Sequence, residues 1–284
     1  MARTYVVTGA ASGIGQALAT LLRRQGHRVI GVDVRSGDVV ADLSTRRGRE
    51  DAVDGVLDES GGRIDGVVAN AGLALPVAQT VAVNYFGAVG FLDGLRPALA
   101  ASSRAPRAVV TSSMATLMPV HPPLVEACLD GDEDRAMSIA ADLEAMGPDV
   151  GALLYPSSKR ALSRWVRRMA GRPQWAGAGI PLNAVGPGIV RTPMTAEMTA
   201  TEEGRAGLAS VVPMPLNGYL EAEQVASLLA WLVSEENTHV CGQTVYVDGG
   251  SDVVLRGDDV WSWHDTPVPV TTAHDTVTGQ PASV

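Results

Sequence analysis

Tyr155 and Lys159 are the residues of this chain whose types and spacing most directly suggest chemistry. Positions four apart on a helix lie on the same face, so we expect the phenol of Tyr155 beside the ammonium of Lys159. A free tyrosine has a pKa of about 10, and a nearby positive charge favours the phenolate and lowers that value. The pair could therefore act as an acid and base. Because such spacing also arises by chance, other residues must support this interpretation.

A glycine-rich turn near the start of the chain is a candidate phosphate-binding loop. It lies between a predicted strand at residues 5–8 and a predicted helix at residues 16–25, where parallel sheets bind nucleotides. Glycines let the backbone approach a pyrophosphate, and the helix N-terminus offers unpaired N–H groups. The spacing is Gly-x-x-x-Gly-x-Gly rather than Gly-x-Gly-x-x-Gly, and an ordinary glycine loop is the alternative. The candidate residues are Gly9, Ser12, Gly13, Ile14 and Gly15.

Asp33 stands near the end of the second predicted strand, residues 29–34, and indicates which nucleotide the turn would bind. An acid at this position accepts hydrogen bonds from the ribose 2′-hydroxyl of NAD and repels the 2′-phosphate of NADP. Arg35 could meet such a phosphate, but Ala10 and Ala11 bring no basic group to the turn. We therefore expect NAD rather than NADP.

Short β-rich segments alternate with helical segments along most of the chain. This alternation is typical of right-handed βαβ units, so we expect an α/β fold with a Rossmann-like, doubly wound parallel sheet. We place it in a single domain, residues 1–255. The further predicted strands lie at residues 66–70, 108–112, 182–185 and 243–247, and the further helices at residues 45–59 and 221–233.

Two segments depart from this alternation. Residues 115–151 hold a proline-rich turn and an acidic helical stretch at residues 124–146, which we interpret as a helical insertion. Residues 256–284 lack periodicity and are rich in Ser and Thr, so we expect a partly disordered tail. Trp261 and Trp263 could fold back over a pocket or an interface, and the sequence favours neither.

The overall composition excludes several classes of function. A formal net charge of −9 provides no general basic field for nucleic acid or anionic lipid, and no apolar run is long enough to span a membrane. Two isolated cysteines support neither a disulfide framework nor a zinc site, and we expect no bound metal. A strand pattern begins at once and leaves no room for a signal peptide, so we expect a cytoplasmic protein. Four arginines at helical spacing are interpreted as the solvated face of one helix: Arg164, Arg167, Arg168 and Arg172.

Taken together, these features resemble the short-chain dehydrogenase/reductase family over residues 8–250. The resemblance implies that Asn84 and Ser113 complete a catalytic set with Tyr155 and Lys159. It also implies that the following residues line the cofactor in addition to the glycine turn and Asp33: Asp42, Leu43, Asn70, Ala71, Gly72, Tyr155, Lys159, Pro187, Gly188, Val190 and Thr192.

The family resemblance implies hydride transfer between C4 of nicotinamide and a carbonyl or carbinol carbon. Tyr155 would exchange the proton of the substrate oxygen, and Ser113 would hold that oxygen by a hydrogen bond. Lys159 would lower the tyrosine pKa and bind the nicotinamide ribose, while Asn84 would anchor a water that links Lys159 to solvent. The ordinary alternatives are a strand-end serine for Ser113 and a helix cap for Asn84.

Ser113 and Tyr155 are 42 residues apart, a longer interval than in most members of the family. This interval resembles the bacterial 3α-hydroxysteroid dehydrogenase/carbonyl reductase subgroup, as do residues 40–45 and 81–87. In that subgroup the insertion blocks the helix face that most relatives use for tetramer assembly, so the resemblance implies a homodimer or an alternative homotetramer. It also implies a hydrophobic alcohol or ketone as substrate, although substrate identity transfers least well between relatives.

Residues 193–216 fall where the family has a mobile substrate lid. An adaptable apolar wall is one interpretation of its large apolar side chains, and core packing is the other. The stretch offers little positive charge, which disfavours acyl-carrier and hydroxy-acid substrates. The apolar residues concerned are Met194, Met198, Met214 and Leu216.

The sequence thus predicts an NAD-dependent oxidoreductase that interconverts a hydrophobic secondary alcohol and its ketone. The main alternative is a dehydrogenase of a non-steroid cyclic alcohol, such as a terpene alcohol. A non-catalytic NAD-sensing module is a more remote alternative, because the chain keeps both Tyr155 and Lys159. A zinc-dependent alcohol dehydrogenase is disfavoured by the scattered cysteines and histidines, which form no ligand cluster.

Overall fold

Valine-rich segments form the strands of this computed structural model, which describes residues 2–102 and 104–262. Within these residues, seven strands make one parallel sheet in the order β3-β2-β1-β4-β5-β6-β9. The sequence order reverses beside β1, which marks the carboxyl edge of the sheet there as the place where such folds bind ligands. The predicted α/β fold is therefore confirmed. The strands are β1 (Thr4–Thr8), β2 (Arg28–Asp33), β3 (Val39–Val40), β4 (Gly66–Ala69), β5 (Arg107–Thr111), β6 (Leu182–Pro187) and β9 (Thr244–Val247).

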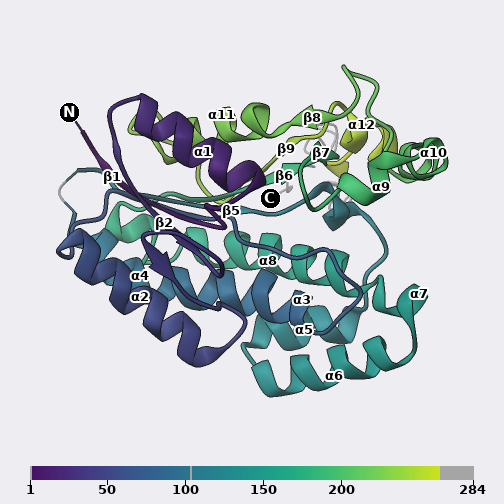
Figure 1. Cartoon of the computed structure of the whole chain (residues 1–284), viewed down its shortest axis with the longest axis horizontal. Coiled ribbons are helices and arrows are strands. Elements are labelled where there is room, and N and C mark those ends of the chain that lie inside the picture. The colour runs from purple at the N-terminus through teal and green to yellow at the C-terminus, as the bar shows by residue number, and fades with distance from the viewer. Residues whose placement is uncertain (1, 103, 263–284) are drawn as a thin grey trace, which may run out of the picture.

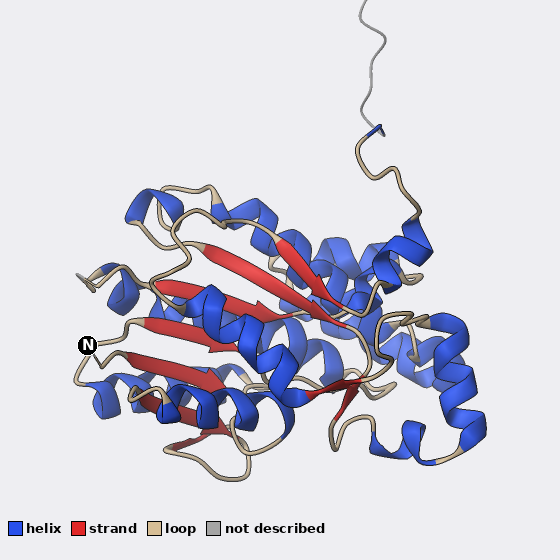
Figure 2. Cartoon of the chain, turned by 90° about the horizontal axis from the view of Figure 1, so that it is seen from above, coloured by secondary structure: helices blue, strands red, loops and turns tan. Residues whose placement is uncertain are grey.

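Helices cover both faces of the sheet, and each face has its own apolar core (Figure 1). On one face, α1 (Gly13–Arg24) and α11 (Ala222–Val233) lie side by side. The other face carries α2 (Arg46–Ser60), α4 (Ala88–Ala100) and α8 (Leu154–Ala170). Figure 2 looks onto the face that α1 and α11 cover, with the strands beneath them. Because both faces are covered, the strands are apolar throughout rather than alternating.

Several short elements complete the described part of the chain. A second, two-stranded parallel sheet pairs β7 with β8 beside the predicted substrate lid, and sequence patterns did not indicate it. The segment predicted to be the lid contains two helices, α9 and α10. The short elements are α3 (Gln79–Val81), the π-helical turn η1 (Ala82–Gly87), the 3₁₀ turns η2 (Met114–Leu117) and η3 (Ala176–Ala178), α7 (Pro148–Gly151), β7 (Val190–Arg191), α9 (Ala196–Ala200), α10 (Glu202–Val211), β8 (Leu220–Glu221) and α12 (Ser251–Arg256).

The helical stretch predicted at residues 124–146 is confirmed and consists of two helices, α5 (Pro122–Asp130) and α6 (Glu133–Ala145). Gly131 ends α5 in the left-handed conformation, with φ of +73°. The carboxylate of Asp132 then accepts a hydrogen bond from a first-turn N–H group of α6 at 3.0 Å. A glycine stop followed by an aspartate cap is a local signal for a break between two helices.

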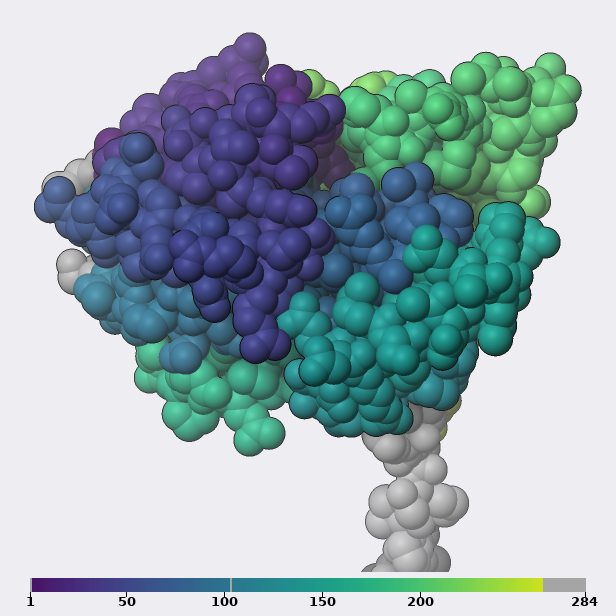
Figure 3. Space-filling view, turned by 60° about the horizontal axis from the view of Figure 1, so that its bottom comes forward, coloured from purple at the N-terminus to yellow at the C-terminus, as the bar shows by residue number. Residues whose placement is uncertain are grey.

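Ion pairs hold the inserted helices against the rest of the molecule. Glu133 of α6 accepts two hydrogen bonds, at 2.9 and 2.7 Å, from the largely buried Arg49 of α2. Glu126 of α5 pairs with Arg164 and Arg168 of α8 at 2.5 and 3.7 Å. The solvated face predicted for these arginines is confirmed for Arg167, Arg168 and Arg172, which are exposed, while Arg164 is half-buried beside α5. Figure 3 shows the inserted segment (teal) beside α2 (indigo).

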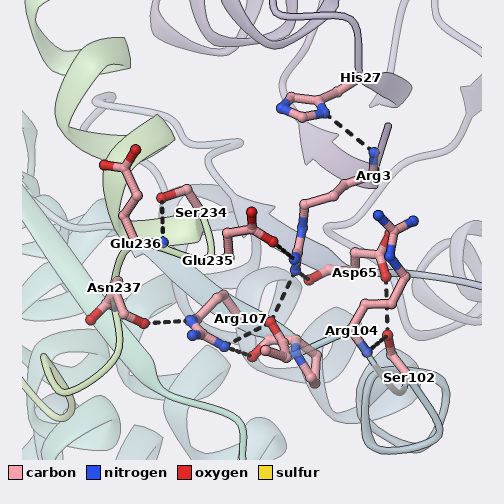
Figure 4. Close-up of polar contacts among 12 residues, drawn as sticks. Arg3, His27, Asp65, Ser102, Arg104, Arg107, Ser234, Glu235, Glu236 and Asn237 are labelled. Atoms are coloured by element: carbon pink, nitrogen blue, oxygen red, sulfur yellow. Dashed lines mark hydrogen bonds and ion pairs between the residues drawn. The ribbon is translucent and has the colours of Figure 1, made fainter. Parts of the chain in front are cut away.

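Buried arginines tie together the amino ends of the central strands, at the edge opposite the glycine turn (Figure 4). Nη2 of Arg3 donates to the carbonyl oxygens of Asp65 and Ala105 at 3.1 and 2.9 Å. Nε of Arg107 donates to the carbonyl oxygen of Asn237 at 2.7 Å. This network closes the amino end of the sheet with backbone contacts and leaves the carboxyl end available for chemistry.

Trp261 does not cover a pocket, since its side chain is 76% exposed. Trp263 and the rest of the predicted tail, residues 263–284, lie outside the described residues, as do residues 1 and 103. None of the helices in the described part of the chain combines the length and apolar character that a membrane span requires. The same residues contain no group of three or more His, Cys, Asp or Glu side chains arranged to hold a metal ion.

Candidate active site

The glycine turn joins β1 to α1 at the carboxyl edge of the sheet, and its geometry requires glycine. Gly9 and Gly13 have φ of +69° and +52°, where other residues are strained. A Cβ on Gly15 would lie 2.2 Å from the carbonyl oxygen of Gly9. Ser12 precedes α1 but its side chain makes no capping bond, so the first N–H groups of the helix are left for a ligand. This arrangement fits the pyrophosphate of a dinucleotide.

Thr8, at the end of β1, connects the glycine turn to the segment that follows β4. Its Oγ1 accepts hydrogen bonds from the N–H groups of Asn70 and Ala71, both at 2.9 Å. The Asn70 side chain donates to the Thr8 carbonyl oxygen at 3.2 Å and accepts from Thr111 Oγ1 at 3.0 Å. The three central strands are thus joined at their carboxyl ends. The sequence indicated Asn70 and Ala71, whereas no local pattern signalled the role of the Thr8 hydroxyl.

Asp33 ends β2 beside the glycine turn and is held by backbone groups. Its two carboxylate oxygens accept hydrogen bonds from the N–H groups of Ala11 and Arg35, at 3.1 and 3.0 Å. The exposed guanidinium of Arg35 lies 3.9 Å from this carboxylate and donates to Ser12 Oγ at 3.3 Å. The negative charge of Asp33 is therefore fixed at the edge of the turn, with a cation on its outer side.

The segment from Pro187 to Thr192 reaches the glycine turn from the other end of the sheet. It leaves β6, and the N–H group of Gly188 donates to a carbonyl of β9 at 3.0 Å. Val190 is buried in β7. A Cβ on Gly13 would lie 3.2 Å from Cγ2 of Thr192, so the two predicted cofactor segments are in contact.

Asp42 and Leu43 follow β3, on the side of Asp33 away from the central strands. The Asp42 carboxylate accepts from the N–H group of Ser44 at 2.9 Å and shapes the turn before α2. Leu43 is buried, and a Cβ on Gly87 would lie 3.1 Å from its carbonyl oxygen. The pair thus lies between β3 and the end of η1.

Lys159 is the only lysine among the 22 lysine and arginine residues of the chain. Its side chain is buried on α8, and Nζ donates to the carbonyl oxygen of Thr111 at 2.9 Å. Burial lowers the pKa of Lys159 to about 8. An ammonium at this position is compact and titrates near neutral pH, which the guanidinium of arginine does not do.

Tyr155 lies one helical turn before Lys159, whose Nζ is 5.9 Å from the centroid of the tyrosine ring. Burial raises the pKa of Tyr155, and a hydrogen bond with Ser113 opposes part of that rise. Desolvation of the phenolate is thus the largest influence on this pKa, and the lowering of the pKa by Lys159 stays a prediction. Ser113 is only 8% exposed, whereas Tyr155 is half-buried.

Asn84 lies in the π-helical turn η1 and is fully buried. Its side-chain amide accepts from Leu73 N at 2.8 Å and donates to Leu73 O at 2.9 Å and to Ser158 Oγ at 3.0 Å. A Cβ on Gly72 would lie 3.0 Å from Asn84 Oδ1 and 3.4 Å from Lys159 Nζ. Asn84 is thus not a helix cap. It joins the segment after β4 to α8 at the level of Lys159.

The apolar residues predicted to form a wall divide into two groups. Met214 is partly buried and packs against a small buried cluster, and its sulfur accepts a hydrogen bond from the N–H group of Ile189 at 3.3 Å. Core packing therefore explains Met214. Core packing does not explain the other three side chains, which are exposed by 46, 42 and 66%, so their role as a wall stays a prediction: Met194, Met198 and Leu216.

The basic residues near this wall already have protein partners. Arg191 pairs with Glu221 at 3.1 Å. Arg205 donates to the carbonyl oxygens of Thr199 and Ala200 at 3.0 and 3.2 Å. An anionic substrate group would have to displace these partners, which agrees with the expectation of an uncharged substrate.

Comparison with known proteins identifies the family. A family model described as short chain dehydrogenase matches residues 3–122, and one described as Enoyl-(Acyl carrier protein) reductase matches residues 136–252. The 3-alpha-hydroxysteroid dehydrogenase/carbonyl reductase of Comamonas testosteroni is 38% identical over 258 residues, which cover 88% of this chain and 97% of that protein. The cis-4-hydroxycyclohexanecarboxylate dehydrogenase of Sinomonas cyclohexanicum is 29% identical and spans 89% of this chain and 97% of its own length.

Solved structures agree with the sequence comparison. The crystal structure of the 3-alpha-hydroxysteroid dehydrogenase from Pseudomonas sp. B-0831 complexed with NADH superposes with a TM-score of 0.81 at 41% identity, covering 90% of this chain and 99% of that one. The predicted resemblance is thereby confirmed. This chain belongs to the short-chain dehydrogenase/reductase family of oxidoreductases.

Proposed function

We propose that this protein uses NAD to interconvert a hydrophobic secondary alcohol and its ketone, with a 3α-hydroxysteroid or a similar carbonyl compound as substrate. The observation that carries the proposal is one cluster of three groups. Ser113 is near enough to Tyr155 to lower the pKa of its phenol, and the ammonium of Lys159 lies beside the tyrosine ring. The cluster lies at the carboxyl edge of the sheet, where the glycine turn also lies.

Tyr155 handles the proton in the proposed reaction. The cofactor, when bound, supplies the hydride acceptor in oxidation and the hydride donor in reduction. In oxidation, Tyr155 takes the hydroxyl proton while the hydrogen on the carbinol carbon leaves as a hydride. In reduction, Tyr155 returns a proton to the oxygen that becomes the alcohol. Ser113 donates a hydrogen bond to the same oxygen, which fixes the substrate and stabilises the charge that develops on it.

Lys159 and Asn84 support the tyrosine in this scheme. The ammonium of Lys159 would stabilise the phenolate of Tyr155 and donate hydrogen bonds to the ribose hydroxyls of the bound nucleotide. Asn84 would hold the segment after β4 and helix α8 at a fixed separation, because its amide bonds to Leu73 and Ser158. A water bound at Asn84 that connects Lys159 to solvent stays a prediction.

The choice of NAD over NADP rests on Asp33. Its carboxylate is held by two backbone N–H groups and retains free lone pairs for a ribose diol. A 2′-phosphate would meet this negative charge at close range. Arg35 is the cation that could offset the repulsion, but its guanidinium already lies next to Asp33. The other proposed cofactor contacts are those of the glycine turn and of residues 42–43, 70–72 and 187–192.

The substrate class rests on the exposed apolar side chains of the lid and on the engaged arginines beside it. A non-steroid cyclic alcohol, such as a terpene alcohol, is the second candidate, because methionines adapt to different apolar shapes. The similarity to a dehydrogenase of a hydroxycyclohexane compound also supports a cyclic alcohol. A silent NAD-sensing role has less support, because the acid–base cluster is intact.

The test is an activity panel with a matched active-site variant. Steroid and monoterpenoid secondary alcohols are assayed with NAD and with NADP, for the protein and for Tyr155→Phe. We expect turnover with NAD that falls on the order of 100-fold or more in the variant, while NADH binding measured by fluorescence is unchanged. Retention of most of the activity by Tyr155→Phe would contradict the assignment.

Three further expectations stay predictions. The catalytic domain is proposed to comprise residues 1–255. The protein is proposed to be cytoplasmic and to assemble as a homodimer or a homotetramer. Light scattering of the purified protein distinguishes the two assemblies.

A further inference from the structure

Arg160, the residue directly after Lys159, makes an unusual set of contacts. No carboxylate pairs with it in residues 2–102 and 104–262, although many other arginines of the chain have such partners. Its guanidinium instead donates from Nε to the carbonyl oxygen of Thr116 and from Nη2 to the carbonyl oxygen of Met118 at 3.0 Å. Both carbonyls belong to the turn that begins directly after Ser113.

The segment on both sides of Ser113 is therefore attached to α8. Before Ser113, Lys159 Nζ donates to the carbonyl of Thr111 at 2.9 Å, and Ser112 Oγ donates to the Lys159 carbonyl at 3.2 Å. After Ser113, Arg160 binds the turn η2. The serine is held between these attachments, and both come from the helix that carries Tyr155.

A second side chain supports the same turn from the sheet. The Tyr246 hydroxyl of β9 lies 2.7 Å from Thr116 Oγ1. The register of the sheet places Tyr246 opposite Gly186, where a Cβ would lie 2.6 Å from the tyrosine ring and 3.5 Å from the carbonyl carbon of Ser113. A glycine is therefore needed for the ring to reach the turn.

We propose that Arg160 is a positioning residue. It fixes the turn after Ser113, with support from Tyr246, so that the serine hydroxyl faces Tyr155 and the substrate oxygen. This inference rests on the proposed roles of Ser113 and Tyr155. A planar guanidinium suits the position because its fork of donors binds two carbonyls at once, whereas an ammonium offers donors from a single point.

The expected consequence of losing Arg160 is a displaced serine rather than an unfolded protein. A misplacement of about 1 Å can reduce a rate on the order of 100-fold. Because the hydrogen bond from Ser113 lowers the pKa of Tyr155, a displaced serine also leaves that pKa higher. Ser113 faces the phenol from the end of β5, and Lys159 is the charged group that faces it from α8.

The first experiment compares Arg160→Met, which keeps the apolar stem, with Arg160→Lys and with a control on the same helix. The control is Arg164→Met, because Arg164 pairs with Glu126 at the surface. For Arg160→Met we expect kcat to fall about tenfold and the pH profile of alcohol oxidation to move to higher pH, with NADH binding unchanged. Arg160→Lys is expected to recover part of kcat. Arg164→Met is expected to match the parent protein in kcat and in its pH profile.

The second experiment is a double-mutant cycle with Ser113→Ala. If Arg160 acts through the serine, Arg160→Met lowers kcat much less in the Ser113→Ala background than in the parent. Equal losses in the two backgrounds, or a loss of activity with an unshifted pH profile, would overturn the proposal. Tyr155→Phe distinguishes a failure of the proposed function from a failure of the role of Arg160. If Tyr155→Phe stays active, the proposed catalytic site is wrong. If Tyr155→Phe is inactive while Arg160→Met has the kcat and pH profile of the parent protein, only the role of Arg160 is wrong.

Discussion

Replacing Lys159 by methionine is expected to make the protein more stable while removing its activity. The side chain is 4% exposed, and burial lowers its pKa from the ordinary value of 10.5 to about 8. At about 1.4 kcal/mol for each pH unit, the buried ammonium costs on the order of 3 kcal/mol at neutral pH. Methionine has a similar length and no charge, but it leaves the Thr111 carbonyl without its donor, which costs about 1 kcal/mol. The net gain in unfolding free energy is about 2 kcal/mol at pH 7.

The pH dependence identifies the cause of this gain. The folded-state pKa of Lys159 lies below the unfolded value, so between about pH 8 and 10.5 the unfolded chain binds more protons and the stability of the parent protein rises with pH. Below pH 8 the ammonium is present in both states and its cost is constant. The advantage of Lys159→Met should therefore be full at pH 6 to 7 and about 1.4 kcal/mol smaller at pH 9.

Urea denaturation at pH 7 and pH 9 measures these differences, with Arg164→Met as an exposed control on the same helix. The pKa itself is also measurable, because Lys159 is the only lysine of the chain. Reductive ¹³C-methylation labels Lys159 and the terminal amine, and NMR follows each through the titration. A Lys159→Met protein that is less stable than the parent at pH 7, or a measured pKa near 10.5, would refute the reasoning.

Three further predictions concern the cofactor turn and the insertion. Asp33→Ser should lower kcat/KM with NAD by about 10- to 100-fold, because a charged hydrogen bond is lost, and should raise kcat/KM with NADP. Steady-state kinetics with both nucleotides test this prediction. Gly15→Ala should weaken NADH binding by tenfold or more in a fluorescence titration, because the added Cβ would lie 2.2 Å from Gly9 O. A tenfold loss of affinity corresponds to about 1.4 kcal/mol of binding free energy. Glu133→Gln leaves the buried guanidinium of Arg49 without its ion pair, so urea denaturation should show a loss of about 2 to 3 kcal/mol, and an unchanged midpoint would contradict the anchoring role of this pair.

Short-range patterns were enough to predict the fold and the identity of the candidate site. Valine-rich runs separated by helical segments predicted a parallel sheet, and the glycine spacing marked the turn after the first strand. The position of Asp33 at the end of the second strand, and the four-residue spacing of Tyr155 and Lys159, are likewise local. Each of these signals depends on backbone geometry within a few residues, which the residue types themselves constrain.

The helical insertion shows where patterns within single elements were insufficient. The left-handed glycine and the aspartate cap divide the predicted helical stretch at residues 124–146 into α5 and α6. The ion pair of Arg49 with Glu133 then joins residues 84 positions apart. No pattern within one element predicts such a partner.

Burial and long-range contacts decided the chemistry of the site, and they exist only in the folded chain. Proximity of Lys159 predicted a lower pKa for Tyr155, whereas desolvation in the folded chain raises it. The contact of Tyr246 with Thr116 spans 130 residues, and Arg160 reaches a turn 42 and 44 residues earlier. Desolvation and hydrogen-bond partners depend on which elements pack together. The residue types near Tyr155 therefore indicated the candidate reacting groups, and tertiary packing decided their pKa values and their positions.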